Sequence, residues 1–521
     1  MKKFFRKSRR FRAKPVRVVP NHQAPEINPD HTVLRRASSR ERFIMLFRIL
    51  MMILGMVALI MAAPLIMAAV LKEKGMIRAF LIPMGAALAT GLIALLLTKK
   101  QNIHLQSKDG FLLVFLTWVI MSLMGAIPYY LSSMDLSFTD SLFESSCGFA
   151  TTGASTIADV ESLPKSLMLW RGMTHWVGGM GIVVFTVALL PLLGVGGFQL
   201  VKAESPGPEK EKVTPKIADS AKILWFVYIG FTGILMLLLK FWGMDWFDAL
   251  IQSFTIMASG GISTKNAGLA YYNSAAIDIT CTIFMLLAAT NFNLYYRMIK
   301  GKWKDIISNT EFRVFLGIFA ATSLAISLAL IPTYGSFLNA LRYGSFHVAS
   351  ILSTTGNLTV NYELWPGFAK TILFGLMFIG GCSASTAGGI KVIRHVVLLK
   401  QAGNELRRII FPRGIFSIHM NGKVGRKDVV YGVAGFIFLY GMVILATTLI
   451  TAASGIDLFS SFCTALAMVG NVGTGFGAIG PNQTYAAFPD YLKWFYSFIM
   501  IAGRLELWTV FILFIPEYWR K

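Results

Sequence analysis

The stretch FATTGAST, at residues 149–156, places small and weakly polar residues in the middle of an otherwise apolar region. Three later stretches align with it when each is centred on a glycine, so that small and hydroxyl residues fall into register. The aligned stretches are ATTGAST (150–156), ASGGIST (258–264), STTGNLT (353–359) and GNVGTGF (470–476). Their central glycines are Gly153, Gly261, Gly356 and Gly473, which are 108, 95 and 117 residues apart. Repetition at this length predicts four copies of one structural unit.

The composition indicates a membrane protein. Of the 521 residues, 55% are hydrophobic and 14% are charged, whereas an average soluble protein carries about 25% charged residues. Four windows contain no Asp, Glu, Lys or Arg: 110–134, 172–201, 314–341 and 429–456. Each is longer than the roughly 20 apolar residues that cross a bilayer as a helix. We therefore expect a chain that crosses the membrane several times.

Long and short apolar segments alternate along the chain. The long ones predict helices at 43–71, 76–98, 110–132, 166–193, 220–243, 275–299, 312–333, 366–399, 429–453 and 486–515. The short ones are 139–150, 246–258, 342–353 and 459–470. Apolar runs of about 10–14 residues suggest re-entrant elements, and each of these runs directly into one glycine stretch.

The expected fold is an all-α polytopic membrane protein. Four helix–pore-helix–loop–helix repeats are expected in a pseudo-fourfold arrangement around one pore, with two extra N-terminal transmembrane helices. The parts are a basic, disordered cytoplasmic tail (1–42), the extra helices (43–108), pore repeat 1 (109–200), pore repeat 2 (219–300), pore repeat 3 with a gate loop (310–400) and pore repeat 4 (428–521).

The net charge of +23 is concentrated in a few segments. Residues 1–42 carry thirteen Lys and Arg against three acids, and residues 391–427 carry nine against one. Lys- and Arg-rich loops of membrane proteins stay in the cytoplasm. The clustered charge is therefore better explained by the orientation of the chain in the membrane than by nucleic-acid binding. It predicts cytoplasmic N- and C-termini. The tail is expected either to contact anionic lipid head groups or to be simply solvated.

The glycine loops suggest an ion filter. Backbone that is not helical cannot face lipid, so at membrane depth it lines a cavity or is buried in protein. Rings of backbone carbonyls can replace the hydration shell of a cation, and glycine allows the angles this needs. Each short helix would also direct the negative end of its dipole at the axis. The candidate filter residues are Thr151, Thr152, Gly153, Ser259, Gly260, Gly261, Thr354, Thr355, Gly356, Asn471, Val472 and Gly473. The alternative is that these glycines are ordinary contacts between packed helices.

Further motifs point to a family. They are WVGGMGIVVFTVALLPLLGVGGFQL (176–200), GGCSASTAGGIKVIR (380–394), GNVGTGFG (470–477) and GRLELWT (503–509). With these motifs the chain, from about residue 43 onward, resembles the TrkH/KtrB superfamily of potassium transporters, in its TrkH branch. The resemblance implies a homodimer in the inner membrane with one pore per subunit, a cytosolic nucleotide-binding regulatory ring of the TrkA type, and K⁺ as the transported ion. It also implies potassium preference, because all four filter positions hold glycine.

The resemblance further implies a gate beneath the filter. It is expected to be a loop that breaks the second helix of the third repeat, in the Gly-, Ser- and Thr-rich stretch GGCSASTAGGIK (380–391). The candidate gate residues are Gly380, Gly381, Ser383, Ser385, Thr386, Gly388, Gly389, Lys391 and Arg504. A charge within the membrane is costly and needs a partner, so Arg504 is expected to hold carbonyls of this loop and to repel an ion there. The alternatives are a kinked helix without a gating role and an arginine that snorkels to the membrane surface. Glu506, two residues further on the same expected helix, would point away from Arg504 and has no predicted role.

Two other functions remain open from the sequence. The protein could be a secondary cation symporter that couples K⁺ to Na⁺ or H⁺, or a transporter with broken helices at its midplane. An intramembrane serine hydrolase would use Ser383 or Ser385 with His395, but a nucleophile and its base must lie within hydrogen-bond distance. No P-loop or zinc pattern is present, so we expect no cofactor and no enzyme. Acidic residues are frequent in the expected outer segments, where their field would raise the concentration of cations near the pore entrance. The alternative is that several of them only cap short helices, a role that Asp140 and Asp248 would fit.

Overall fold

The computed structural model describes residues 39–97, 107–193, 217–421, 423–424, 427–481 and 483–520. The helices are α1 (Ser39–Ile60), α2 (Ala62–Val70), α3 (Met76–Leu97), α4 (Ser107–Tyr130), α5 (Phe138–Ala150), α6 (Lys165–Leu193), α8 (Ile217–Phe241), α9 (Trp246–Met257), α10 (Ala275–Ala288), α11 (Phe292–Ile299), α12 (Trp303–Ser308), α13 (Thr310–Tyr334), α14 (Phe337–Leu352), α15 (Gly367–Leu376), α16 (Val392–Ile410), α17 (Lys427–Ala452), α18 (Leu458–Gly470), α19 (Asp490–Arg504), α20 (Trp508–Phe511) and α21 (Pro516–Trp519). The predicted tail up to residue 38 lies outside the described residues, as does 194–216.

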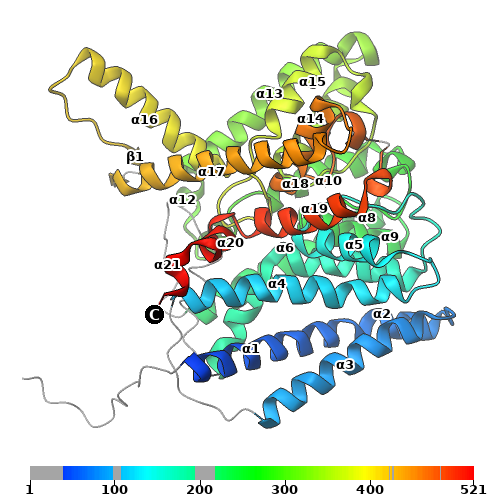
Figure 1. Ribbon diagram of the computed structural model, residues 1–521. Helices are drawn as coiled ribbons and strands as arrows, with labels where there is room; N and C mark the ends of the chain where they lie inside the picture. The colour runs from blue at the N-terminus through cyan, green and yellow to red at the C-terminus, as the bar shows by residue number, and fades with distance from the viewer. Residues whose placement is uncertain are drawn as a thin grey trace, which may run out of the picture.

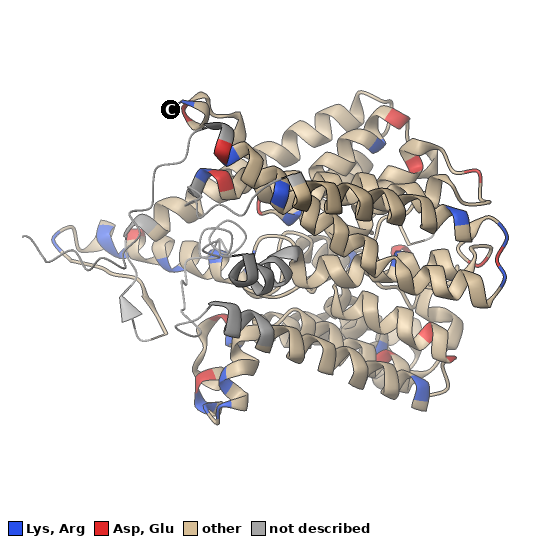
Figure 2. Ribbon diagram, turned by 90° about the horizontal axis from the view of Figure 1, so that it is seen from below, with Lys and Arg blue, Asp and Glu red and all other residues tan. Residues whose placement is uncertain are grey.

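Six helical spans of the described chain are long and apolar enough to cross a membrane, and two bent helix pairs raise the number to eight if each pair is one span. The six are α1 with α2, α3, α4, α8, α13 and α17. Figure 2 shows most Lys, Arg, Asp and Glu toward the two ends of the helices, with a zone of mainly other residues between them. The prediction of a multi-span helical membrane protein is therefore confirmed.

The two extra N-terminal helices lie on one side of the molecule. α1 and α3 pack against each other and against α4, while α2 contacts α6 (Figure 1). At the opposite side, α16 projects from the body together with the short antiparallel pair β1 (His419–Met420) and β2 (Lys423–Val424). The helix predicted to end at residue 399 therefore continues to Ile410.

Three predicted continuous helices are broken in the structure. α10 and α11 meet at 91°, and α19 meets the α20 segment at 109°. The helix predicted at 366–399 stops at the end of α15, and the next fifteen residues, 377–391, form the α15–α16 linker without regular helix. α6 is kinked at Gly181, where φ is 73°. Apolar periodicity does not reveal the breaks after α10 and α19, because apolar segments continue on both sides of each break. The break between α15 and α16 is different: it contains the Gly-, Ser- and Thr-rich stretch 380–391, where the family resemblance implied an unwound loop.

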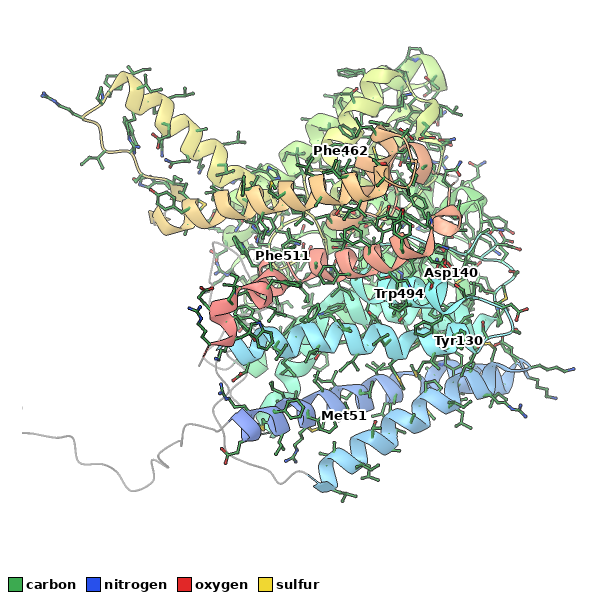
Figure 3. All side chains as sticks on the ribbon, in the orientation of Figure 1. Met51, Tyr130, Asp140, Phe462, Trp494 and Phe511 are labelled. Carbon is green, nitrogen blue, oxygen red and sulfur yellow. The ribbon has the colours of Figure 1, made fainter. Side chains whose placement is uncertain are left out.

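Acceptor side chains begin three of the four short helices. Ser137, Asp245 and Asp457 accept hydrogen bonds of 3.0, 3.2 and 3.0 Å from backbone N–H groups in the first turns of α5, α9 and α18. The prediction that Asp140 and Asp248 are the caps is wrong, because both lie inside the first turn. Asp140 instead forms a 2.7 Å ion pair with α19, near Trp494 (Figure 3).

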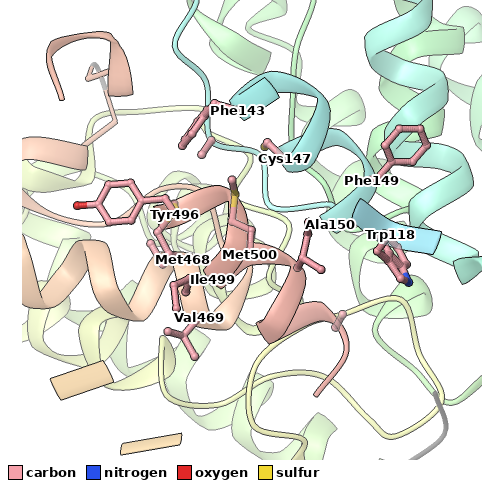
Figure 4. Close-up of a cluster of buried hydrophobic side chains, with 14 of the residues drawn as sticks. Trp118, Phe143, Cys147, Phe149, Ala150, Met468, Val469, Tyr496, Ile499 and Met500 are labelled. Atoms are coloured by element: carbon pink, nitrogen blue, oxygen red, sulfur yellow. The ribbon is translucent and has the colours of Figure 1, made fainter. Parts of the chain in front are cut away.

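The core around α5 brings together helices far apart in the sequence. Cys147 and Ala150 of α5 face Met468 and Val469 of α18 and Tyr496, Ile499 and Met500 of α19, whereas Phe149 lies on the other side, toward Trp118 (Figure 4). α5 also crosses α6 so closely that a Cβ atom on Gly178 would lie 2.7 Å from the carbonyl carbon of Phe149. This glycine is needed for the crossing, since the neighbouring group is backbone and cannot rotate away.

We therefore predict that Gly178→Ala destabilises the protein by about 1–3 kcal/mol or more, the usual cost of overpacking. The midpoint temperature of unfolding of the purified protein in detergent measures this. Gly230→Ala on α8 is the matched control, because a Cβ atom there meets nothing within 4 Å. Equal unfolding temperatures for the two variants would contradict the prediction.

Candidate functional site

Each of the four short helices ends in a loop with the same backbone shape. In each loop the aligned glycine and the residue two before it have positive φ, while the residue between them stays outside the left-handed region. The φ angles are 53° and 83° for Thr151 and Gly153, 57° and 62° for Ser259 and Gly261, 55° and 75° for Thr354 and Gly356, and 53° and 76° for Asn471 and Gly473. Glycine adopts such angles readily, whereas a β-branched residue does so rarely. The register of the sequence alignment is thus also a register of backbone conformation.

The same hydrogen bond closes all four helix ends. The residue before each glycine donates its N–H to the carbonyl five residues earlier. The pairs are Thr152 to Cys147 (3.0 Å), Gly260 to Thr255 (2.8 Å), Thr355 to Ser350 (2.8 Å) and Val472 to Ala467 (3.0 Å). A bond of this span after a left-handed residue is typical of helix C-termini. It satisfies a carbonyl of the last turn and turns the chain back sharply.

The four loops meet in a closed ring. A Cβ atom placed on any of the four glycines would clash with a backbone carbonyl of a neighbouring loop. Starting from Gly153 and following the chain, the carbonyl oxygens concerned belong to Gly260, Thr355, Val472 and Thr152. Each loop thus touches the next, and the fourth touches the first. The twelve residues predicted for the filter all belong to these loops.

A cavity of about 340 Å³ lies against the ring and is lined by residues of all four loops, among them Gly153, Gly261, Gly356 and Thr474. Two cationic side chains also line it, and both have acidic partners. Arg171 contacts Glu144 at 3.0 Å, and Lys265 contacts Asp248 at 3.8 Å. Both positive charges at the cavity are therefore balanced by a carboxylate.

Buried hydroxyl groups hold three of the loops from behind. Each donates to a carbonyl at the aligned glycine or directly after it. The bonds are Thr255 to Ile262 (3.0 Å), Ser350 to Asn357 (2.7 Å) and Tyr485 to Gly473 (3.1 Å). Such bonds fix where the remaining carbonyls point. An arrangement of this kind can coordinate a dehydrated cation through backbone oxygens.

The α15–α16 linker contacts three of the four loops. The Gly388 N–H donates to the Thr354 hydroxyl at 2.7 Å, and the Thr386 and Ser259 hydroxyls are 2.9 Å apart. A Cβ atom on Gly388 would lie 3.0 Å from Cβ of Asn471. The linker holds all the residues predicted for the gate except Arg504. They are Gly380, Gly381, Ser383, Ser385, Thr386, Gly388, Gly389 and Lys391.

The broken helix α10–α11 and the start of α13 hold the linker in place. The Cys382 N–H donates to the Ala289 carbonyl at 2.8 Å, where α10 ends. Glu311 of α13 is buried and accepts from the backbone N–H groups of Ser383 (2.7 Å) and Ile393 (3.2 Å). No motif in the sequence singles out Glu311. Its only signal was an acid in the first turn of a helix, which the helix dipole explains equally well.

Arg504 bridges the linker and α6. Its guanidinium donates to the carbonyl of Thr386 at 2.7 Å and to those of Gly178 and Gly179, both at 2.7 Å. The three carbonyls come from two segments that would otherwise be free to separate at this point. A planar guanidinium suits such a bridge because it presents several donors in a fixed geometry.

Glu506 has a partner that the sequence did not suggest. The prediction that it continues the helix of Arg504 is wrong, because α19 ends at Arg504 and Glu506 has a φ of 56°. Its carboxylate forms an ion pair with Arg394 of α16. The Arg394 guanidinium also lies 3.7 Å from the ring centre of Phe436. Glu506 therefore ties the C-terminal segment to α16.

The residues proposed for a serine hydrolase are not arranged as one. The Ser383 hydroxyl donates to Glu311 at 3.2 Å, and the Ser385 hydroxyl donates to the Cys382 carbonyl at 2.6 Å. His395 Nε2 lies 3.2 Å from the carbonyl of Phe378. Neither hydroxyl is bonded to the imidazole, so the geometry that a nucleophile and base require is missing at this place.

Acidic side chains in the loops beyond the spans are held in their charged form. A hydrogen bond from the Asn266 side chain lowers the pKa of Asp159 below its usual value. Hydrogen bonds from Ser460 at the start of α18 lower the pKa of Asp457. Both carboxylates are therefore anionic at neutral pH. Such charges raise the local concentration of cations.

These features define a class of protein: a multi-span helical membrane protein in which four re-entrant loops meet at one centre. The family model described as a cation transport protein, TrkH, matches residues 76–521. The chain belongs to this TrkH family, and thus to a family of transport proteins rather than of enzymes.

Relatives and a solved structure agree with this assignment. The chain is similar to the Trk system potassium uptake protein TrkH of Escherichia coli strain K12, with 37% identity over 91% of this chain and 100% of that protein. It is 36% identical to the potassium uptake protein TrkG of the same organism, over 89% of this chain and 96% of that protein. The crystal structure of the potassium transporter TrkH from Vibrio parahaemolyticus matches with a TM-score of 0.82 and 33% identity, over 93% of this chain and 100% of that chain.

The contacts of Arg504 predict that Arg504→Met speeds backbone hydrogen exchange in the linker by roughly tenfold, because a hydrogen bond to a charged group contributes about 1.5–3 kcal/mol. Hydrogen exchange of the purified protein, read by mass spectrometry, measures this. Arg342→Met is the control, because Arg342 pairs with Asp278 of α10 and not with the linker. Unchanged exchange in the linker of the first variant would refute the bridging role.

Proposed function

We propose that this chain takes up potassium across the inner membrane through a filter made of backbone carbonyl oxygens. The closed ring of the four glycine loops carries the proposal, because it brings carbonyls from four separate segments to one constriction. The relatives support the choice of ion, since TrkH and TrkG of Escherichia coli are named as potassium uptake proteins. The pseudo-fourfold repeat of helix, short helix, loop and helix is part of this proposal.

In the proposed filter, the ion exchanges its water for main-chain oxygens. The short helices α5, α9, α14 and α18 end at the loops, so that the partly negative ends of their dipoles face the centre. The alternating left-handed residues turn the backbone so that carbonyls can face the ion. The size and field of the oxygen ring then favour K⁺ over Na⁺, which would have to give up a more tightly held hydration shell.

The α15–α16 linker is the proposed gate. It contacts the second, third and fourth loops, and Arg504 ties it to α6. In this closed arrangement the positive charge of Arg504 adds an electrostatic barrier to a cation. Opening requires the linker to leave the Arg504 bridge, and the bonds to α10 and α13 would act as its hinges.

We further propose a homodimer with one pore per subunit, opened from the cytoplasm by a nucleotide-binding regulatory ring of the TrkA type. Both termini would then be cytoplasmic, and the chain itself would bind no cofactor. We propose two segments of the chain as the surface that faces this partner. The first, 202–218, lies almost wholly outside the described residues, while the second, 400–428, includes the projecting end of α16 and the β1–β2 pair. A regulator that binds there would act on the linker through α16, which directly follows it.

The filter is tested by Gly153→Ser. We expect the ratio of K⁺ to Na⁺ uptake to fall roughly tenfold, which corresponds to about 1.4 kcal/mol of lost discrimination. The physical reason is that a side chain at this left-handed position clashes with the carbonyl of Gly260. Uptake of K⁺, Rb⁺ and Na⁺ is measured in cells that lack their own potassium systems, with Gly230→Ser as the control. An unchanged ratio would exclude this filter.

The gate is tested by Arg504→Ala. Removing the bridge and its charge should raise the rate of K⁺ uptake several-fold. The reason is that the closed gate loses the free energy of at least one charge-assisted hydrogen bond, so the open gate is populated more often. The ratio of K⁺ to Na⁺ should stay as in the wild type, since the three hydrogen bonds described for Arg504 go to the linker and to α6. A rate equal to or below that of the wild type, at equal protein content of the membrane, would argue against the gate.

A further inference from the structure

The first loop differs from the other three in what holds it from behind. Glu144 lies on α5, nine residues before Gly153, and the matching positions in the other short helices are uncharged: Gln252, His347 and Thr464. Both Glu144 and its partner Arg171 on α6 are buried, with 2% of each residue exposed. A buried ion pair is costly to desolvate and is weak evidence for stability by itself. A role in positioning would explain why it is found here.

The carboxylate of Glu144 has two separate tasks. Its Oε2 accepts from Arg171 Nε at 3.0 Å, while its Oε1 accepts from the Ser155 hydroxyl at 2.7 Å and from the Thr156 N–H at 2.7 Å. The Thr156 hydroxyl also lies 3.3 Å from Oε1. One carboxylate thus fixes the chain two and three residues after Gly153. Because the end of α5 fixes the chain before Gly153, the glycine is held from both sides.

The same contacts continue to the fourth loop. The carbonyl of Ser155 accepts from the Tyr485 N–H at 2.8 Å, and the Tyr485 hydroxyl donates to the Gly473 carbonyl at 3.1 Å. A continuous path of bonds therefore runs from Arg171 and Glu144 through Ser155 and Tyr485 to the aligned glycine of the fourth loop. Gly153 and Gly473 are also direct neighbours in the ring.

We propose that Glu144 and Arg171 form a positioning pair that sets the ion preference of the ring by orienting the first loop and, through Tyr485, the fourth. This rests on the proposed function of the four loops as a potassium filter. Arg171 lines the cavity at the ring, so Glu144 also keeps its positive charge from repelling an approaching cation. The pair does not contact the ion; it acts through the backbone that does.

The test compares four variants by the ratio of K⁺ to Na⁺ uptake, each normalised to the amount of protein in the membrane. Glu144→Gln keeps the size of the side chain but removes its charge, and it should lower the ratio roughly tenfold, as expected for weakened charge-assisted bonds. Ser155→Ala removes one of the bonds to the Glu144 carboxylate and the hydroxyl that accepts from the Ile157 N–H, and it should lower the ratio roughly threefold. Because Ser155→Ala leaves the ion pair of Glu144 and Arg171 intact, it still tests the proposal if Glu144→Gln does not fold.

Asp278→Asn is the matched control. The pair of Asp278 and Arg342 is also largely buried and ties a short helix, α14, to its neighbour, but it contacts no residue that follows a loop glycine. This variant should lower the amount of protein and keep the ratio. If Glu144 had only a structural role, Glu144→Gln would likewise lower the amount of protein and keep the ratio of K⁺ to Na⁺ uptake. An equal ratio in Glu144→Gln and Asp278→Asn would therefore overturn the proposal.

Gly153→Ser distinguishes a failure of the proposed filter from a failure of the proposed positioning pair. If it changes the ratio while Glu144→Gln and Ser155→Ala keep that of the wild type, the filter stands and the positioning pair is wrong. If Gly153→Ser also leaves the ratio unchanged, the filter itself fails, and the positioning pair fails with it.

Discussion

The irregular parts of the molecule depend on one constraint: backbone that leaves the helical conformation inside a membrane must be buried in protein or line a cavity. The four loops meet this constraint in the same way, with a bond from the residue before the glycine to the carbonyl five residues back. The left-handed residues that this turn requires explain the glycines. The close approach of a neighbouring loop's carbonyl to each glycine then leaves no room for a side chain.

The same constraint explains the polar residues inside the apolar body. The α15–α16 linker has no helix of its own, so its backbone groups bind to Glu311, to the open end of α10 and to Arg504. A break in one helix therefore supplies hydrogen-bond partners for irregular backbone elsewhere. The carbonyls freed where α10 ends accept from the linker, and Arg504 binds carbonyls of α6 close to its kink at Gly181. A charged residue here serves as a set of hydrogen-bond partners for irregular backbone.

The four loops share a backbone shape, but different side chains hold each of them in place. Behind the loops stand a glutamate with an arginine, two side-chain hydroxyls of the short helices and a tyrosine, each bound to a different loop position. The ring is thus symmetric where its backbone faces the centre and asymmetric in the layer around it. An uneven surrounding layer allows one loop to influence ion preference more than the others, even though all four carry glycine.

The sequence alone determined the class of the protein, the four short helices that lead into the loops, and the positions of the glycines. These follow from local properties, namely the length of apolar runs and the need for glycine in left-handed turns. Only the tertiary structure decided which loop touches which, where the chain bends after α10 and α19, and which partners Glu144, Glu311, Arg504 and Glu506 have. Such pairings join residues up to several hundred positions apart, and nothing in the local pattern of a single sequence records them. The length of α16 and the true caps of the short helices also depended on contacts that the hydrophobic pattern does not contain.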